Sequence, residues 1–519
     1  MTTVVPDSDT LTRDALAVLQ PTFVGTHRAP DWLLAQLENG MTGVGLFGRN
    51  VVSTAQLAEL TGHLRSARPD VLVAIDEEGG DVTRLDVHGG SFVPGNHALG
   101  SVDDPELTRA VGAAIGRRLA ACGVNVNWAP SADINSDPEN PVIGVRSFGE
   151  EPGLVARHTV AYVEGLQSAG VAACVKHFPG HGNTNVDSHH ALPRIDIDLG
   201  TLHERELAPF RAAIAAGTRC VMSAHILVPA LDPDRPGTLS PAVLNGLLRA
   251  PVAEGGLGFD GLIYSDAIEM RAVAETYGLD QGCVLAIAAG ADALCIGGSP
   301  SDEAEVLRLR DALVNAVRSG ELPEERLHEA AERVRALGRW TADERARLAA
   351  AGPADAAADA EIGLAAARRA VRVSRPADGR LRPLTRPAHV ATLSSAANIA
   401  VGDQTPWGPG PELARLLPGT TTSGHATADA ERAGPAGLAA EVLATAGERP
   451  LVVVFRDRHR HPWVAETVAE LLAARPDTVV VEMGVPHAGP VGDTYLATYG
   501  AARVCGQAVA ELLTGHQPG

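Results

Sequence analysis

Eight short apolar runs, spread over roughly the first three hundred residues, constrain the fold of this chain more than any other feature. A polar loop and then an Ala- and Leu-rich stretch of helical character follow each run. The runs are 22–25, 43–47, 71–75, 124–128, 171–175, 220–224, 261–264 and 293–296. Strands that alternate with helices form parallel sheets, and eight strands are the number that closes a barrel. We therefore predict an α/β fold with a (β/α)8 TIM-type barrel over residues 1–345.

An open, doubly wound sheet is the alternative fold with the same alternation of strands and helices. That fold would need a glycine-rich phosphate-binding loop after its first strand. The segment PTFVGTHRAP, which surrounds the first apolar run, contains no such loop. The barrel is therefore the favoured fold.

The last third of the chain predicts a second, smaller domain. Residues 346–373 are Ala-rich and charged, which predicts a helical linker. Apolar runs at 389–393, 451–455 and 478–485 then alternate with helical segments, which predicts an α/β sandwich domain over residues 374–519. The Gly-, Thr- and Pro-rich stretch 403–428 is expected to be an irregular loop.

The charge and composition of the chain exclude several kinds of partner. A net charge of −20 argues against nucleic acid or an anionic membrane surface. No window approaches the ~20 apolar residues of a membrane span. The N-terminus lacks the basic and apolar regions of a signal peptide, and the six cysteines show no pairing pattern. We expect a cytoplasmic protein with reduced cysteines.

Polar residues follow the predicted strands at the positions where a barrel carries its catalytic groups. Asp76 follows the third run, Arg146 the fourth, residues 176–190 the fifth, His225 the sixth and Asp266 the seventh. A single one of these residues could be a solvated loop charge. Agreement among five loops predicts one site at the rim of the barrel.

The richest loop is 175–193, with the sequence VKHFPGHGNTNVDSHHALP. Its glycines and prolines exclude a helix, so its polar side chains leave the end of the fifth strand on a loop. Lys176 is the only lysine in the chain. An arginine-biased composition could have left one lysine by chance, or the site could need a compact ammonium group where a planar guanidinium does not fit. The position of Lys176 beside His177 favours the functional interpretation.

The residue types in these loops suit acid/base and nucleophilic chemistry on a small molecule. Asp266 ends an apolar strand, and Lys176 and Arg146 are the cations that would keep it ionised. Asp187 and His189 are two residues apart, so the carboxylate can hold the imidazole in one tautomer. A nucleophilic carboxylate with a separate acid/base group is the arrangement of a retaining glycosidase.

Four motifs together resemble glycoside hydrolase family 3. They are KHFPGHG with DSH after it, DEEGG-x-V-x-R, NP-x-x-G-x-RSFG and SD-x-x-x-M. The chain resembles the bacterial β-N-acetylglucosaminidase (β-hexosaminidase) branch, in a two-domain form, and the resemblance covers the whole predicted barrel. It implies a retaining exo-enzyme that releases terminal N-acetylglucosamine from β-linked glycosides, such as fragments of peptidoglycan or chitin. We expect no cofactor and no metal, and a monomer or homodimer.

The resemblance also assigns roles to individual residues. Asp266 aligns with the nucleophile, His189 with an acid/base histidine and Asp187 with the partner of that histidine. The residues at sugar-binding positions are Asp76, Arg84, Arg146, Lys176 and His177, and His225 is placed near the site.

The chain departs from the family pattern at two positions and offers a second acid/base candidate. Glu77 and Asp81 stand where the family usually has Gln and Arg, which changes the local charge. Two-domain members of the glucosidase type take a glutamate from the second domain as acid/base, and Glu482 follows a strong apolar run. The intact DSH motif favours His189 over Glu482.

Several other functions are compatible with parts of the sequence. A metal site could use His177, His181, His189 and His190, but a Gly/Pro loop without cysteine is a poor zinc site.

Other reactions on a sugar are also compatible with the sequence. A histidine acid/base carries no negative charge when deprotonated, so phosphate could replace water and make the enzyme a phosphorylase. A broader β-glucosidase is also possible on this scaffold. Substrate-assisted hydrolysis usually needs neighbouring carboxylates, which we do not expect beside Asp266 in YSDAIEM, so this mechanism is disfavoured. A non-catalytic sugar-binding barrel would need the nucleophile or the dyad to be missing.

Overall fold

A computed structural model describes residues 8–187, 192–349, 355–374, 381–395 and 400–516. The described residues form two compact units. The first unit consists of Met1–Glu77, Thr108–Pro141 and Glu150–Asp355, and the second consists of Glu78–Leu107, Val142–Gly149 and Ala356–Gly519. The second unit therefore contains two short segments that interrupt the first one in the sequence.

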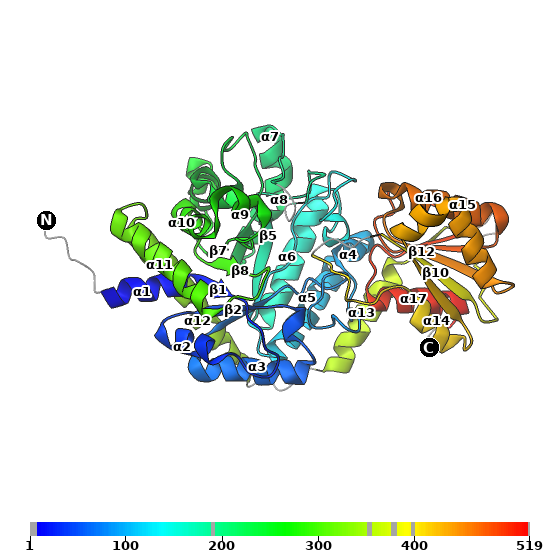
Figure 1. Cartoon of the computed structure of the whole chain (residues 1–519), viewed down its shortest axis with the longest axis horizontal. Helices are drawn as coiled ribbons and strands as arrows, with labels where there is room; N and C mark the ends of the chain where they lie inside the picture. The colour runs from blue at the N-terminus through cyan, green and yellow to red at the C-terminus, as the bar shows by residue number, and fades with distance from the viewer. Residues whose placement is uncertain (1–7, 188–191, 350–354, 375–380, 396–399, 517–519) are drawn as a thin grey trace. The chain divides into compact units, whose positions relative to one another are not determined.

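The first unit contains eight strands that all pair in parallel. They are β1 (Leu19–Pro21), β2 (Gly43–Leu46), β3 (Leu72–Ile75), β4 (Val126–Asn127), β5 (Ala172–Phe178), β6 (Cys220–Ser223), β7 (Leu262–Tyr264) and β8 (Leu294–Ile296). Strands β2 to β7 pair in sequence order, and β1 pairs with β8. Parallel bridges from Thr22 to Gly45 and from Tyr264 to Ala293 join the two groups. The ring is closed, which confirms the predicted barrel (Figure 1).

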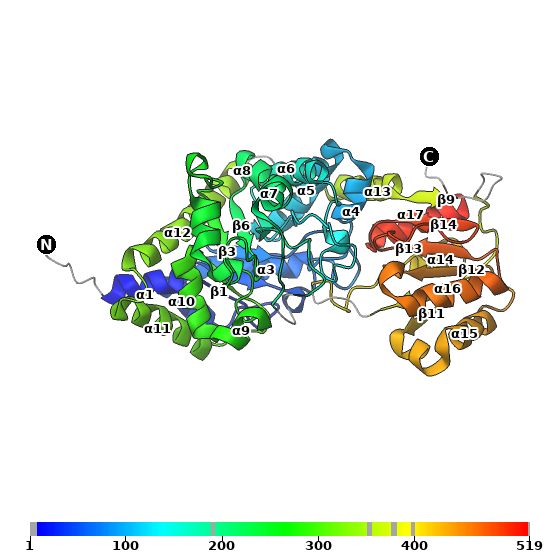
Figure 2. The same ribbon diagram turned by 90° about the horizontal axis from the view of Figure 1, so that it is seen from above.

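Helices separate the strands along the chain, as Figure 2 shows from a second direction. They are α1 (Ser8–Ala17), α2 (Asp31–Asn39), α3 (Thr54–Ala67), α5 (Pro105–Ala121), α6 (Pro152–Ser168), α7 (Leu199–Thr201), α8 (Leu207–Ala215), α9 (Arg271–Tyr277), α10 (Leu279–Ala289), α11 (Glu303–Ser319) and α12 (Glu324–Leu348). Short 3-10 segments η1 (Gly48–Asn50), η4 (Gly237–Leu239) and η6 (Val252–Glu254) and π-helical segments η3 (Leu202–Glu206) and η5 (Ala242–Arg249) lie in the connections.

Large side chains fill the interior of the barrel, as expected for eight strands. The rings of Trp128 and Tyr264 meet edge to face, with centroids 6.1 Å apart. Gly45 gives this core the room that it needs, because a Cβ there would lie 2.8 Å from the Trp128 ring. The barrel is thus a packed core, and function is confined to its rim.

The first strand lies three residues upstream of the predicted run 22–25. The sequence interpretation followed the apolar Phe23 and Val24, but Val24 is 70% exposed. The strand uses Gln20 instead, which is fully buried and pairs in register with Cys295. Because this strand contains a buried polar residue, its sequence does not form the apolar run that predicts a strand.

The second unit is built on one six-stranded sheet, in the order β11-β10-β12-β13-β14-β9. The strands are β9 (Arg372–Ser374), β10 (His389–Ser394), β11 (Thr421–Ala426), β12 (Leu451–Phe455), β13 (Val479–Glu482) and β14 (Thr494–Ala497). All pairs are parallel except that of β9 with β14. The five parallel strands, β10 to β14, thus follow the doubly wound order 2-1-3-4-5 when they are numbered along the chain.

Helices cover both faces of this sheet. They are α4 (Asn96–Val102), α13 (Ala356–Ala370), α14 (Gly410–Leu416), α15 (Thr427–Ala446), α16 (Pro462–Ala474) and α17 (Arg503–Thr514), with 3-10 segments η2 (Gly144–Arg146) and η8 (Arg458–Arg460). One apolar cluster joins the sheet to α13, α14 and α17, and another joins the opposite face to α15 and α16. Figure 1 shows the two layers of helices. The predicted α/β sandwich is confirmed.

The stretch 403–428 is not the irregular loop that we predicted. It contains α14 and the edge strand β11, whose residues alternate between half-buried and exposed. An edge strand of Thr, Ser, Gly and His contains no apolar run, so the apolar pattern of the chain does not predict it. The predicted domain limits at 345 and 374 stay predictions, but α13, in the expected linker, belongs to the second unit.

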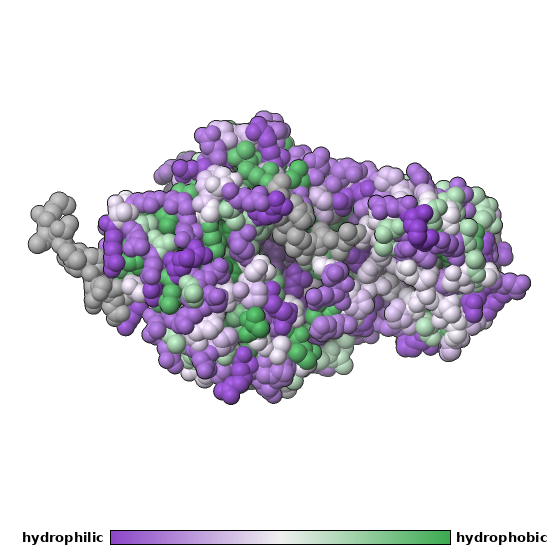
Figure 3. Space-filling view, in the orientation of Figure 1, coloured by the Kyte–Doolittle hydropathy of each residue, from purple (hydrophilic) through white to green (hydrophobic). Residues whose placement is uncertain are grey.

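No helix within the described ranges is long and apolar enough to cross a membrane. On the face shown in Figure 3, hydrophilic residues predominate and hydrophobic residues form small groups between them.

Candidate active site

A buried ion pair joins two predicted site residues at the carboxyl end of the barrel. Lys176 is the fifth residue of β5, and Asp76 directly follows β3. The ammonium nitrogen of Lys176 lies 2.6 Å from Oδ1 of Asp76, and the two side chains are 3% and 19% exposed. A charge this deeply buried needs a partner, and Asp76 supplies it. The lone lysine is thus part of a built site.

Asp266 and His225 meet at the same rim. Asp266 lies two residues beyond β7, and its Oδ1 accepts the N–H of Ala267 at 2.8 Å. Nε2 of His225, beyond the end of β6, donates to the carbonyl of Ala267 at 2.9 Å, and Thr238 bonds to its Nδ1 at 2.8 Å. The imidazole therefore supports the backbone of the residue that follows Asp266.

The buried thiol of Cys295 lies within the electric field of these groups. Burial raises the pKa of Cys295 in β8, and the carboxylates of Glu269, Asp266 and Asp76 raise it further, whereas the charge of Lys176 lowers it. Asp76, Lys176 and Asp266 stand at the carboxyl ends of β3, β5 and β7, at the same end of the barrel. Their joint role in one site stays a prediction.

Asp133, which the sequence interpretation missed, organises the loop after β5. Its fully buried carboxylate accepts the backbone N–H groups of His177 (3.2 Å) and His181 (2.7 Å) and a hydroxyl bond from Ser131 (2.9 Å). Nδ1 of His177 lies 2.7 Å from its Oδ2. Burial by itself would raise the pKa of Asp133, but the charge and hydrogen bonds of His177 hold that pKa well below its ordinary range. Asp133 therefore orients the predicted sugar-binding His177.

Glycines let the same loop turn sharply against its neighbours. Gly180 has a φ of +126° and packs against Glu206, and a Cβ on Gly182 would collide with the Ile134 carbonyl. Burial raises the pKa of Glu206, whose side chain is 1% exposed and bonds to Arg205 at 2.7 Å. The motif KHFPGHG is thus a close-packed turn, and its glycines are required by sterics.

Two predicted sugar-binding arginines belong to the second compact unit. Arg146 forms a buried bidentate pair with Glu78, at 2.8 and 3.0 Å, and donates to the carbonyl of Val142 at 3.2 Å. Arg84 donates to the carbonyl of Ala400 at 2.8 Å. Their participation in the sugar site stays a prediction.

The predicted acid/base dyad is described only in part. Asp187 is half-buried, and His189 lies outside the described residues, as does His190. The pairing of Asp187 with His189 therefore stays a prediction that rests on the DSH motif.

The comparison with known proteins decides the family. The family model described as glycosyl hydrolase family 3 N terminal domain matches residues 19–337. The chain belongs to glycosyl hydrolase family 3. This membership confirms the predicted resemblance and makes the chain a glycoside hydrolase.

Named proteins that are similar to this chain agree with this assignment. Beta-hexosaminidase A of Pseudoalteromonas piscicida is 34% identical over 353 residues, which are 62% of this chain and 58% of that protein. The Beta-hexosaminidase of Chromobacterium violaceum is 35% identical over 327 residues, or 62% and 86% of the two chains. The structure of a family 3 beta-N-acetylglucosaminidase from Paenibacillus sp. str. FPU-7 is similar with a TM-score of 0.84 and 34% identity, over 98% of this chain and 97% of that one.

The departure from the family 3 pattern at Asp81 is compensated inside the second unit. Oδ1 of Asp81 accepts the N–H of Ala501 at 2.7 Å, and its Oδ2 lies 3.5 Å from the guanidinium of Arg456. Burial raises the pKa of Asp81, and Arg456 opposes that rise. Asp81, which stands where the family usually has arginine, is thus paired with the cation Arg456 of the second unit.

Glu482, the rival acid/base group, has a structural role. It is fully buried in β13, where Oε2 accepts the hydroxyl of Tyr495 at 2.6 Å and Oε1 accepts the N–H of Arg458 at 3.2 Å. Burial raises the pKa of Glu482. A carboxyl group with both oxygens bonded inside a sheet is poorly placed to exchange protons with a substrate.

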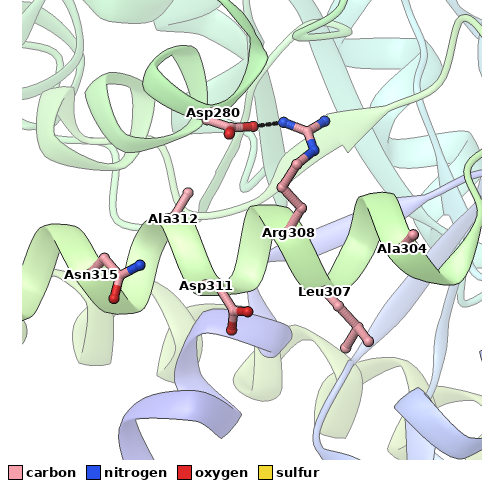
Figure 4. Close-up of a pocket in the computed structure, with 7 residues that line it drawn as sticks. All are labelled: Asp280, Ala304, Leu307, Arg308, Asp311, Ala312 and Asn315. Atoms are coloured by element: carbon pink, nitrogen blue, oxygen red, sulfur yellow. Dashed lines mark hydrogen bonds and ion pairs between the residues drawn. The ribbon is translucent and has the colours of Figure 1, made fainter.

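Two cavities lie in regions away from Asp76 and Lys176. Across the described ranges, no group of three or more His, Cys, Asp or Glu side chains is arranged to hold a metal ion. A cavity of about 480 Å³ lies on the outer helices. Figure 4 shows the residues that line it, among them Arg308, which is paired with Asp280. A second cavity of the same size lies beside the start of β4, where Arg65 and Arg345 donate to the carbonyls of Gly123 and Pro69.

Glu269 is the carboxylate beside Asp266 that the sequence interpretation overlooked. Burial raises its pKa to about 7, and the nearby charges of Asp266 and Glu305 add to the effect. The folded protein therefore holds this proton more tightly than the unfolded chain, whose glutamate titrates near 4.5. Binding of this proton adds to the free energy of unfolding. The contribution is complete below pH 4.5 and is lost as the pH rises from 4.5 to 7.

We expect Glu269→Gln to reveal this loss, because glutamine does not titrate. The free energy of unfolding of the variant, relative to the wild type, should rise by up to about 3 kcal/mol between pH 4.5 and pH 7.5. Urea unfolding at a series of pH values measures the difference. A constant difference over this range would show that Glu269 titrates normally.

Proposed function

We propose that this family 3 glycoside hydrolase is a retaining exo-β-N-acetylglucosaminidase that releases terminal N-acetylglucosamine from β-linked glycosides. The observation that carries the proposal is the gathering of Asp266, Asp76 and the only lysine of the chain at one end of the barrel. The relatives support the sugar, because they are named as β-hexosaminidases and a β-N-acetylglucosaminidase.

In the first step of the proposed reaction, the Asp266 carboxylate attacks C1 of the sugar. The bond from C1 to the glycosidic oxygen breaks, and protonated His189 gives its proton to that oxygen, so the aglycone leaves as an alcohol. The sugar is then held as an ester on Asp266. Asp187 keeps the imidazole oriented through this step.

In the second step, neutral His189 takes a proton from water while the oxygen of that water attacks C1. The ester bond to Asp266 breaks and the carboxylate is restored. Two displacements at C1 leave the product with the β-configuration of the substrate. The roles of Lys176 and Asp76 are to bind sugar hydroxyls, and a buried ion pair presents both a donor and an acceptor for that purpose.

Assays of p-nitrophenyl sugars, with and without phosphate, test this function. We expect release of N-acetylglucosamine from the β-N-acetylglucosaminide, at a rate that phosphate does not change, and much slower turnover of the β-glucoside. Formation of a sugar 1-phosphate would identify a phosphorylase instead. Comparable rates on the two sugars would identify a broader β-glucosidase.

We expect Lys176→Arg to lose at least ~2 kcal/mol in kcat/KM, because a planar guanidinium does not replace a compact ammonium in a closed site. The burial of Lys176 and its 2.6 Å contact with Asp76 are the physical reason. Arg194→Lys is the matched control, since Arg194 lies on the same loop and its side chain is 54% exposed. Wild-type kinetics for Lys176→Arg would show that the presence of a single lysine at this position is a coincidence of composition.

The proposal extends to the origin of the substrate and the location of the enzyme. Fragments of peptidoglycan or chitin are the expected glycosides, and the cytoplasm is the expected compartment, because six cysteines without a pairing pattern suit a reducing environment. The free thiols of all six are buried. Fractionation of cells followed by immunoblotting tests the location, and light scattering distinguishes a monomer from a homodimer.

A further inference from the structure

The loop that follows β8 is held by the carboxylate of Glu269. One oxygen, Oε1, accepts the backbone N–H groups of both Gly297 and Gly298, the first at 2.5 Å. The contact is close-packed, because a Cβ at Gly298 would lie only 3.0 Å from the same oxygen. Successive N–H groups that converge on one oxygen form a small anion-binding nest. Glu269 thus fastens the β8 loop to the loop that carries Asp266.

Two further side chains hold the same loop from the other side. Arg49, which follows β2, donates to the carbonyl of Gly297 at 3.2 Å, and Thr22, which follows β1, donates to the carbonyl of Ser299 at 3.0 Å. The guanidinium of Arg49 also donates to the hydroxyl of Thr22 at 2.7 Å. Four loops at one end of the barrel are therefore tied together at the β8 loop.

The second oxygen of Glu269 is in a different position. Oε2 is buried and makes no hydrogen bond to any residue that the structure describes. An unpaired buried oxygen disfavours the ionised carboxylate and favours the neutral acid. The charged and titratable groups that act on Glu269, or on which it acts, are Asp266, Glu305 of α11, Arg49, Cys283 of α10 and Cys295.

We propose that Glu269 is a positioning residue for Asp266, which holds the β8 loop in place and changes the charge beside the nucleophile when it gains or loses a proton. The proposal rests on the role of Asp266 as nucleophile. It assigns Glu269 no contact with the substrate and no covalent step.

The electrostatic effect has a definite sign. The transition state of glycoside cleavage carries positive charge on the sugar ring. An ionised Glu269 adds negative charge beside Asp266, the residue proposed to attack that ring, and so stabilises the transition state, whereas the neutral acid does not. Burial raises the pKa of Glu269 to about 7, so this change of charge falls between pH 5.5 and 8.5, the range of the assay below.

The experiment uses the full-length chain and the 2,4-dinitrophenyl β-glycoside of N-acetylglucosamine. This leaving group departs without protonation, so the titration of His189 drops out of kcat/KM for the first step. We expect the wild-type kcat/KM to rise by about three- to tenfold as the pH passes 7. Glu269→Gln should stay at the low-pH wild-type rate from pH 5.5 to 8.5. Glu269→Ala, which also releases the loop, should lose about a further tenfold in kcat.

Glu275→Gln is the matched control, because it removes the same charge from α9, where the side chain is 59% exposed. It should keep the wild-type rise. A flat wild-type profile, a rise that persists in Glu269→Gln, or equal rates for the Gln and Ala variants would each overturn the proposal.

A readout that does not depend on activity separates this proposal from the proposed function. If the wild type fails to cleave the glycoside, the assigned reaction is wrong. The difference in Tm between Glu269→Gln and the wild type still reports the proton on Glu269, and it should grow between pH 5 and pH 8. A difference in Tm that does not change with pH would contradict the proposed titration of Glu269, whatever reaction the enzyme catalyses.

Discussion

Replacement of Asp266 by alanine is expected to abolish turnover, with a fall in kcat of about four orders of magnitude or more for good and poor leaving groups alike. Every substrate has to pass through the ester on Asp266, so no leaving group avoids the loss. The position of Asp266 beyond β7, near Asp76 and Lys176, is the structural reason. Steady-state kinetics on two glycosides measures the effect.

A covalent label provides the direct check on Asp266. A 2-fluoro or 5-fluoro glycosyl donor should trap the intermediate, and mass spectrometry of the peptides should find the sugar on this residue. Asp234→Ala, an exposed aspartate on the loop after β6, is the control and should keep wild-type rates. An active Asp266→Ala variant, a label on another residue, or a first-formed product of inverted configuration would refute the assignment.

Replacement of His189 by alanine is expected to slow the enzyme in proportion to how poor the leaving group is. A natural disaccharide or an alkyl glycoside needs a proton on the departing oxygen, and general acid catalysis of this kind contributes about 10²- to 10⁴-fold. A dinitrophenyl glycoside should lose far less in its first step. Asp187→Ala should show the same pattern more mildly, since the imidazole remains. Azide should speed the second step only where that step has become limiting.

Glu482→Ala is the control for the acid/base assignment. Both oxygens of Glu482 are bonded inside the C-terminal sheet, so its removal should affect stability and leave the dependence on the leaving group unchanged. If Glu482→Ala shows that dependence and His189→Ala does not, the acid/base group comes from the second domain.

The sequence determined the class of fold and the family because both are written in local patterns. Eight apolar runs with helical stretches between them predict a parallel barrel, since each run buries the same kind of strand in the same way. The motifs KHFPGHG, DEEGG and SD-x-x-x-M are contiguous, so they can be found without knowledge of contacts. Asp76, Lys176 and Asp266 follow strands, and parallel strands bring their carboxyl ends to one edge.

Local sequence patterns did not predict the structure at positions where the burial of a residue depends on a partner far away in the chain. Strand β1 contains Gln20, which is buried only because the barrel closes against β8. Strand β11 lies at an edge with no fully buried face, so its sequence resembles a loop. Asp81 departs from the family pattern, and Arg456 and Ala501, far away in the chain, make that departure tolerable.

The tertiary structure alone decided what surrounds the candidate chemistry. Asp133 gathers two backbone N–H groups and an imidazole from a loop more than forty residues away, and Glu269 takes two amides from the loop after β8. A carboxylate in a sequence has no pKa shift and no partner. It acquires both only when folding removes water and brings distant dipoles and charges within a few ångströms, because electrostatic interactions depend on distance in space and on the surrounding dielectric.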